Sequence, residues 1–188
     1  MSRQTPTDLL RRQHQNILRV ASVLERILED EPVTGSLDFD GVADCIDFIR
    51  LYADALHHGK EEDLLFPALE EVGMPRDSGP VAVMLHEHRQ GRQYAAAMAD
   101  ALPAAREGDR EAHDRLVNAA FGYIRLIRQH ILKEDNILFN WADQMIPEPA
   151  CRSLCAAYEG VCARHFDGRS VAELEAILER LLERDPGA

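Results

Sequence analysis

Apolar residues recur every three or four positions along nearly the whole chain, which is the pattern of helices that bury one face. The alternating runs typical of strands are hard to find. We therefore predict an all-α fold, in which breaks rich in Gly and Pro separate four long helices. The predicted helices cover Thr7–Asp30, Asp38–Val72, a segment from Ser78 into Pro103–Gly108, and Asp109–Met145.

Particular residues mark where these helices begin, end or bend. Thr7 is the predicted N-cap of the first helix, because threonine hydroxyls accept bonds from free backbone N–H groups. The segment Glu31–Gly35 should end that helix. Pro67 lies inside the second helix and should kink or restart it, because proline has no N–H.

The short breaks predict that consecutive helices are antiparallel, in an up-down-up-down four-helix bundle over residues 5–146. Residues 147–188 form a C-terminal extension with two short helices, at about Ala150–Phe166 and Ser170–Arg184. The second of these opens with a capping box. The two helices should pack outside the bundle or extend a dimer surface, so a homodimer stays open.

The second and fourth long helices contain a repeated segment. Residues 57–67 read HHGKEEDLLFP and residues 130–140 read HILKEDNILFN, with His, Lys, Glu, Leu and Phe at matching places. Glu62 of the first copy matches Asp135 of the second. The two copies indicate that the chain is built from two similar helical hairpins.

The repeat decides which histidine pairs with which glutamate. Alignment selects His57 with Glu61, matching His130 with Glu134. Side chains four residues apart differ by about 40° in direction and about 6 Å in height, so each pair can point at one spot. His58 is about 100° further round the helix, and we expect it not to be a ligand.

The first and third helices each add a lone histidine, His14 and His88, at nearly the same interval before the pairs. Four imidazoles and two carboxylates would then meet inside the bundle. Such a set suits iron, zinc or copper, since calcium and magnesium prefer oxygen ligands. Two six-coordinate ions need about twelve bonds, and this set with bridging glutamates and a solvent-derived bridge leaves about two positions open.

The expected burial of these histidines and glutamates also favours a metal site. His130 and Glu134 share a predicted helix face with apolar residues that include Ile137 and Trp141. Uncompensated carboxylates in such surroundings cost several kcal/mol each. Metal ions are the simplest compensation, and their binding would stabilise the fold.

Other polar residues have simpler interpretations. The histidines outside the six-residue set are expected not to be ligands; they are His58, His86, His113 and His165. Cys151, Cys155 and Cys162 lie on one helical stripe, either as small buried groups or as a redox-active thiol set. Arg92, one turn after His88, either supports the site or extends along the surface.

The chain resembles the hemerythrin-like, HHE cation-binding proteins. The resemblance covers about residues 5–145 and is carried by His14, residues 57–67, Glu87-His88 and residues 130–139. It implies two non-haem iron ions, oxo- or hydroxo-bridged, in a four-helix bundle. The implied terminal ligands are His14, His57, His88 and His130, and the implied bridging ligands are Glu61 and Glu134.

One departure from the resemblance changes the expected function. Oxygen-carrying hemerythrins resemble this pattern but place a second histidine four residues from the first on the third helix. Met84 and Arg92 occupy those two positions here. The site is therefore expected to be one ligand short of an oxygen carrier, which favours sensing, redox or repair roles. The Glu-x-x-His pairs of ferritin-like bundles are also missing, which argues against iron storage.

The composition of the chain limits the kinds of partner that it can bind. The formal net charge of -12 disfavours nucleic acid and anionic membranes, which bind clustered Lys and Arg. No stretch reaches the roughly 20 apolar residues of a membrane span, and the start has no signal-peptide core, so we expect a cytoplasmic protein. The predicted function is binding or sensing of oxygen or nitric oxide. A di-iron redox enzyme, an iron-donating iron–sulfur repair protein and a structural zinc site stay open as alternatives.

Overall fold

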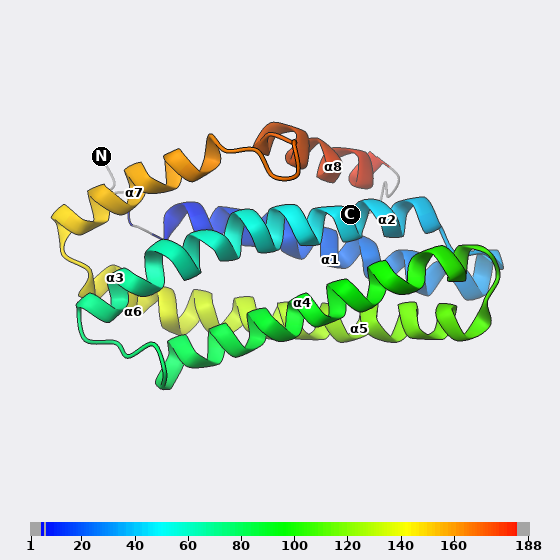
Figure 1. Cartoon of the computed structure of the whole chain (residues 1–188), viewed down its shortest axis with the longest axis horizontal. Coiled ribbons are helices and arrows are strands. Elements are labelled where there is room, and N and C mark those ends of the chain that lie inside the picture. The colour runs from blue at the N-terminus through cyan, green and yellow to red at the C-terminus, as the bar shows by residue number, and fades with distance from the viewer. Residues whose placement is uncertain (1–4, 6, 184–188) are drawn as a thin grey trace.

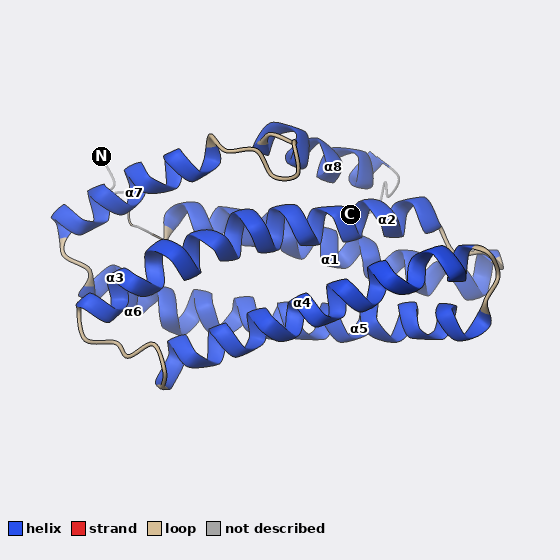
Figure 2. Cartoon of the chain, in the orientation of Figure 1, coloured by secondary structure: helices blue, strands red, loops and turns tan. Residues whose placement is uncertain are grey.

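Four long helical rods lie side by side in the computed structural model, which describes Thr5 and residues 7–183 (Figure 1). Consecutive rods run in opposite directions along the molecule, and only loops join the helices (Figure 2). The all-α prediction is confirmed, since the described residues form no strand and only one isolated bridge pairs Phe166 with Arg169.

Two of the rods are single α-helices and two are composite. The first rod is α1 (Asp8–Thr34) and the third is α4 (Gly79–Arg106). The second rod joins α2 (Phe39–Phe48), η1 (Ile49–His58), η2 (Glu61–Leu65) and α3 (Phe66–Glu71), where η marks π-helix. The fourth joins α5 (Arg110–Lys133), η3 (Glu134–Leu138) and α6 (Phe139–Met145).

The ends of α1 differ from the predicted ones. The helix continues through Pro32 and ends at Gly35, whose φ of 75° is left-handed and whose N–H donates to the Glu31 carbonyl. Glycine adopts this conformation without a steric penalty, so Gly35 ends the helix. Thr7 occupies the N-cap position, but its hydroxyl donates to the carboxylate of Asp143 at 2.8 Å and makes no cap bond.

A π-helical turn begins at the glutamate of each repeat copy. The N–H of Phe66 donates to the Glu61 carbonyl, and the N–H of Phe139 donates to the Glu134 carbonyl, five residues back in both cases. The predicted restart is seen, since α3 begins at Phe66 with Pro67 in its first turn, although the rod continues without a loop. The second copy forms the same turn without a proline, so the turn belongs to the repeat itself. Single π turns are frequent at functional sites.

The π turn also changes which side chains after Glu134 face inward. Ile137 and Trp141 are each 45% exposed, so the prediction that they share the buried face of His130 was wrong. The extra residue in the turn rotates the helix that follows, and Leu138 and Phe139 are buried instead.

The hydrophobic core consists of two clusters with a polar layer between them. Each rod crosses from one cluster to the other at its site residues. On the first rod, for example, Leu10 belongs to the smaller cluster, Ile17 to the larger, and buried His14 lies between them. The fold therefore places the predicted site residues at one level of the bundle.

The tail helices lie along one side of the bundle and complete both clusters (Figure 1). In α7 (Glu148–Cys162), Tyr158 packs into the smaller cluster, and in α8 (Val171–Glu183), Ile177 packs into the larger. The predicted capping box is confirmed: the Ser170 N–H donates to Glu173 at 2.7 Å, and the Glu173 N–H donates to the Ser170 hydroxyl. The predicted helix end at Arg184 lies outside the described residues.

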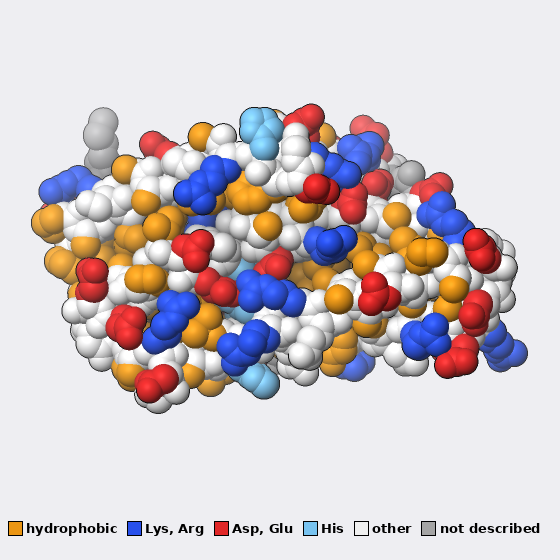
Figure 3. All heavy atoms as spheres, viewed as in Figure 1, with side chains coloured by type: hydrophobic (Ala, Val, Ile, Leu, Met, Phe, Trp, Pro, Cys, Tyr) orange, Lys and Arg blue, Asp and Glu red, His pale blue; other side chains and the backbone are white. Residues whose placement is uncertain are grey.

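Acidic and basic side chains are distributed over the helices of the visible face (Figure 3). Among the helices that the structure describes, none combines the length and the apolar character that crossing a bilayer would require.

Helix capping allows a first test of the fold. The Asp109 carboxylate accepts bonds from the N–H groups of Glu111 and Ala112 at 2.9 and 3.1 Å, whereas Ser78, at the start of α4, makes no side-chain cap bond. Asp109→Ala should lower the free energy of unfolding by about 1 kcal/mol. Ser78→Ala should change it by less than about 0.5 kcal/mol. Chemical denaturation measures both, and equal effects would contradict the assignment.

Candidate metal centre

Two buried carboxylates form the middle of the polar layer. Glu61 and Glu134 are fully buried, and none of their four carboxylate oxygens has a hydrogen-bond donor among the described residues. They come from the π turns of the second and fourth rods, so they approach each other from opposite rods. Two ionised carboxylates in this position require cations close to them.

Each carboxylate lies between two histidines from different rods. Glu134 is 3.2 Å from Nε2 of His14 and 3.2 Å from Nε2 of His130. Glu61 is 3.5 Å from Nε2 of His57 and 3.5 Å from Nε2 of His88. The structure thus brings all six residues predicted from the sequence into one buried layer, and each glutamate is placed to bridge two positions.

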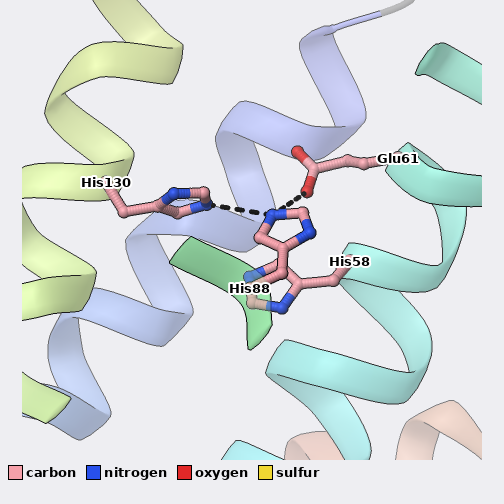
Figure 4. Close-up of side chains that lie close together, drawn as sticks. All are labelled: His58, Glu61, His88 and His130. Atoms are coloured by element: carbon pink, nitrogen blue, oxygen red, sulfur yellow. Dashed lines mark hydrogen bonds and ion pairs between the residues drawn. The ribbon is translucent and has the colours of Figure 1, made fainter. Parts of the chain in front are cut away.

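The donor atoms fall into two overlapping groups, within each of which they lie within 4.8 Å of one another. Group A contains His14, His57, Glu61 and Glu134. Group B contains His58, Glu61, His88 and His130, which point toward one another from three rods (Figure 4). Glu61 belongs to both groups, and this sharing is the arrangement that two neighbouring ions would need.

His58 is a member that the sequence analysis missed. It is buried, its ring stacks on the His88 ring with centroids 3.9 Å apart, and its Nε2 has no partner among the described residues. The expectation that His58 is not a ligand therefore conflicts with its position. In the π-helix η1, consecutive side chains differ in direction by less than the 100° of an α-helix. The side chains of His57 and His58 therefore point to either side of Glu61, and both face the interior.

In each of the five histidines of groups A and B, the second ring nitrogen, Nδ1, is hydrogen-bonded to a neighbouring side chain. The Nδ1 atoms donate at 2.8 to 3.3 Å, and four of the five acceptors are carboxylates. The pairs are His14 with Asp135, His57 with Gln13, His58 with Asp54, His88 with Glu62 and His130 with Glu87. Such bonds fix the ring orientation and turn Nε2 toward the layer. The Nε2 atoms of His14, His57 and His58 have no hydrogen-bond partner among the described residues. Those of His88 and His130 lie 3.2 Å apart (Figure 4).

These supporting residues follow the internal repeat. Glu62 and Asp135 each come directly after a bridging glutamate, and they hold His88 and His14 respectively. The residues before the two lone histidines, Gln13 and Glu87, hold His57 and His130 in the same way. The acidic residue after each glutamate was visible in the aligned repeat, and it was the signal that could have identified this layer.

The two halves differ in charge at one matched position. Lys133 forms an ion pair with the carboxylate of Glu87, whereas the matching Lys60 donates to the neutral amide of Gln13 at 3.3 Å. Lys60 is fully buried, and burial lowers its pKa, although Cys162 and Glu61 counteract this effect. His57 therefore has a neutral acceptor with an ammonium behind it, and His130 has an anionic one.

Arg92 has a defined role in the supporting layer. Its guanidinium donates to Asp54 at 2.8 Å and to Glu62 at 2.7 Å, and these two carboxylates hold His58 and His88. Burial tends to raise the pKa of Glu62, but the His88 and Arg92 contacts lower it to about 2. Of the two interpretations of Arg92, the structure supports the one in which it stabilises the site.

In the metal-free protein, bound protons compensate part of the buried negative charge. Burial and the charge of Glu134 raise the pKa of Glu61 well above its usual value. Burial works to lower the pKa of His130, but the negative charge of Glu134 outweighs it and raises the pKa to about 9. Burial and the charge of His88 lower the pKa of His58 to about 3. The metal-free layer thus keeps His130 charged and His58 neutral.

The donor chemistry fits transition metals. Five imidazoles and two carboxylates form a mixed nitrogen and oxygen set that suits iron, zinc or copper. Calcium and magnesium would require a shell made mainly of oxygen.

The other histidines and the tail cysteines lie outside the metal centre. His86 and His165 are exposed, and His113 bonds to Glu31 at 2.7 Å far along the bundle. The three tail cysteines do not form one set, because Cys151 packs in the smaller core cluster and Cys162 packs against the larger one. All of them are free thiols.

Sequence comparison agrees with this geometry. The sequence model of the hemerythrin HHE cation binding domain matches residues 5–142, most of the chain. The chain belongs to this family. The match ends within α6, so it reaches into all four rods and includes every residue of groups A and B. It does not include the tail helices.

Relatives of this HHE protein occur in mycobacteria. It is 24% identical over 180 residues to uncharacterized protein Rv1995 of Mycobacterium tuberculosis strain H37Rv, covering 94% of this chain and 69% of that one. Uncharacterized protein Mb2018 of Mycobacterium bovis matches with the same identity and coverage. No solved structure gives a significant match.

The supporting layer of this HHE protein can be tested through Glu62. Glu62→Ala removes the acceptor of His88 Nδ1 and should weaken metal binding about 10- to 100-fold. The neighbouring Asp63 is exposed, and Asp63→Ala should leave the affinity unchanged. Competition with a chelator of known affinity measures both variants. Equal affinities of Glu62→Ala and the unmodified chain would contradict the role of Glu62.

Metal uptake should release protons. The pKa of His130 is raised to about 9, so near pH 7 the metal-free ring is protonated and must lose its proton before Nε2 can bind a metal. The apparent affinity should therefore rise as the pH increases toward 9. Calorimetric titrations in two buffers with different ionisation enthalpies measure the release. Heats independent of the buffer would contradict this prediction.

Proposed function

We propose that this protein holds two iron ions between its four rods and uses them to bind or sense a small diatomic ligand, oxygen or nitric oxide. One observation carries the proposal: buried imidazole and carboxylate donors from all four rods form two overlapping groups that share Glu61. The family supports cation binding as such. The identity of the metal, the number of ions and the ligand belong to the proposal.

The proposed ligand set is the six residues predicted from the sequence together with His58. The proposed ligands are His14, His57, His58, Glu61, His88, His130 and Glu134. His58 supplies the imidazole that the third rod lacks at Met84 and Arg92. The ligand count therefore no longer argues against oxygen binding. Five imidazoles and two bridging carboxylates make about nine of about twelve bonds, which leaves positions for solvent and a small ligand.

Bound iron would supply a redox-active centre that can accept a diatomic ligand. The chain's own residues supply the rest. The two apolar core clusters flank the layer on its two sides along the bundle. The Nδ1 acceptors hold the rings in place, and their negative charges favour cations in the layer. A hemerythrin-like up-down-up-down bundle, a cytoplasmic location and a possible homodimer are parts of the same proposal.

A redox or iron-donating repair enzyme is the second candidate. It is favoured by the position of Cys162, whose thiol lies next to buried Lys60. Lys60 is linked through Gln13 to His57 of group A, so two side chains connect the thiol to that group. Peroxide or nitric oxide consumption that Cys162→Ala abolishes would favour this candidate, and consumption unaffected by Cys162→Ala would exclude its thiol version.

Metal content and visible spectra test the proposal. The protein purified without added metal should contain about two iron ions, and its spectrum should respond to oxygen, azide or nitric oxide. His58→Ala should lose about one ion per chain, because His58 belongs to group B alone. His86→Ala, which changes an exposed histidine, is the control and should keep both. Zinc in place of iron, or a spectrum insensitive to all three molecules, would overturn the proposed function.

A further inference from the structure

A cavity of about 360 Å³ lies between η1, α4 and α5, beside the metal centre. Its lining includes two exposed residues, Arg50 and Asp100, and the buried histidines of group B. Along α4 it extends from Asp100 to His88, about 18 Å of α-helix. In Figure 3, a histidine side chain shows between the second rod and α4, with acidic and basic side chains around it. The cavity therefore connects the surface of the molecule with the metal centre.

The cavity reaches group B and not group A. His58, His88 and His130, the three histidines of group B, line it. His14 and His57, the histidines of group A, do not. The side chain of His58 is 6% exposed, whereas that of His14 is 0% exposed. The path from the surface thus ends at group B.

Group A is enclosed on the side away from group B. The ring of His14 stacks on the ring of buried Phe139, with centroids 5.2 Å apart. Behind His57, the Gln13 amide accepts a hydrogen bond from the ammonium of fully buried Lys60. A cation approaching from that side would meet packed rings and a positive charge.

The cavity has room for a hydrated metal ion. A water molecule takes about 30 Å³ in the liquid, so an ion with six waters needs roughly 180 Å³. The volume of about 360 Å³ exceeds this requirement. An ion can therefore enter with its water shell and exchange the waters for ligands at the inner end.

The charges along the cavity favour cations. Three acids and two arginines line it and sum to -1; they are Arg50, Asp54, Glu87, Arg92 and Asp100. Just outside the lining, Glu62 pairs with Arg92 and Lys133 pairs with Glu87, and these two outer charges cancel. The net charge of -12 on the whole chain acts in the same direction. Cations are thus attracted to the cavity, and anions are not.

Glu61 joins the two groups. One of its carboxylate oxygens, Oε1, lies 3.5 Å from Nε2 of His57 in group A. The other, Oε2, lies 3.5 Å from Nε2 of His88 in group B. Because one oxygen faces each group, an ion in group B can move to group A while it stays bound to the same carboxylate.

We propose that metal ions enter and leave the centre through this cavity, that group B is the first site they reach, and that group A is loaded from group B across Glu61. The inference rests on the proposed function only in that both groups bind metal. It goes beyond that function because it gives the two groups different roles in metal uptake, whatever ligand the loaded centre binds.

Filling the cavity should slow the passage of metal without changing the affinity. Ala95→Leu adds bulk to the lining, and in a close-packed interior an ion passes only when that side chain moves aside. Stopped-flow absorption measures Co²⁺ uptake by the full chain, and an excess of chelator measures Co²⁺ release. Both rates should fall about tenfold, because a blocked path raises the barrier equally in the two directions. Ala97→Leu, an exposed change on the same helix outside the cavity, is the matched control and should keep both rates.

Two backgrounds with one intact group each test the route to group A. His14→Ala leaves group B intact, and His58→Ala leaves group A intact. Ala95→Leu should slow Co²⁺ uptake in both backgrounds, because group A is reached only through the cavity. Uptake by group A at a rate that Ala95→Leu does not change would show a separate entrance and overturn the proposed order.

Two results in the unmodified background would also overturn the proposal: rates that Ala95→Leu leaves unchanged, or slower uptake without slower release, which would indicate a distorted site. If Ala95→Leu does not fold, Ala99→Leu narrows the outer part of the cavity and gives the same test. These rates are independent of the iron spectra. Two ions bound at rates that ignore the cavity would refute this inference alone, whereas a chain that never binds a second ion would refute the proposed function.

Discussion

Two carboxylates without hydrogen-bond donors, buried at the centre of the bundle, are the constraint on which the rest of the structure depends. Glu61 and Glu134 would each cost several kcal/mol if they stayed ionised and unpaired. That cost is comparable with the 5–15 kcal/mol of net stability typical of a whole domain. The buried charge therefore has to be compensated: by protons on His130 and Glu61 when metal is absent, and by metal ions when it is present.

Four acidic residues around the centre serve the same constraint. Asp54, Glu62, Glu87 and Asp135 surround the histidines and accept their Nδ1 protons. Arg92 and Lys133 neutralise part of this charge from outside. The layer is thus built from inside outward with alternating charge, and with the two central glutamates it uses six of the 33 acidic residues of the chain.

The two halves of the molecule share a design and differ in three respects. His58 has no counterpart, because the matching position in the second copy is Ile131. Gln13 replaces the acid that Glu87 supplies, and the cavity between η1, α4 and α5 is lined by the histidines of group B only. Two ions in groups A and B would therefore have different surroundings: group A in a closed pocket backed by Lys60, and group B beside that cavity. This asymmetry distinguishes the chain from a simple duplicated hairpin.

The sequence by itself determined the helical class, the repeat and six residues of the centre, because helix periodicity and spacing of four residues are local properties that survive without tertiary contacts. It also contained the signal for Glu62 and Asp135, in the acid that follows each bridging glutamate. Only the tertiary structure decided the position of His58, the partners of Arg92 and the cavity of about 360 Å³ beside group B. These three features depend on the π turns, which rotate the side chains away from the directions that an ideal α-helix would give them. They also depend on how closely η1, α4 and α5 approach one another. The distances between rods come from packing of the whole core, and no segment of the chain encodes them alone.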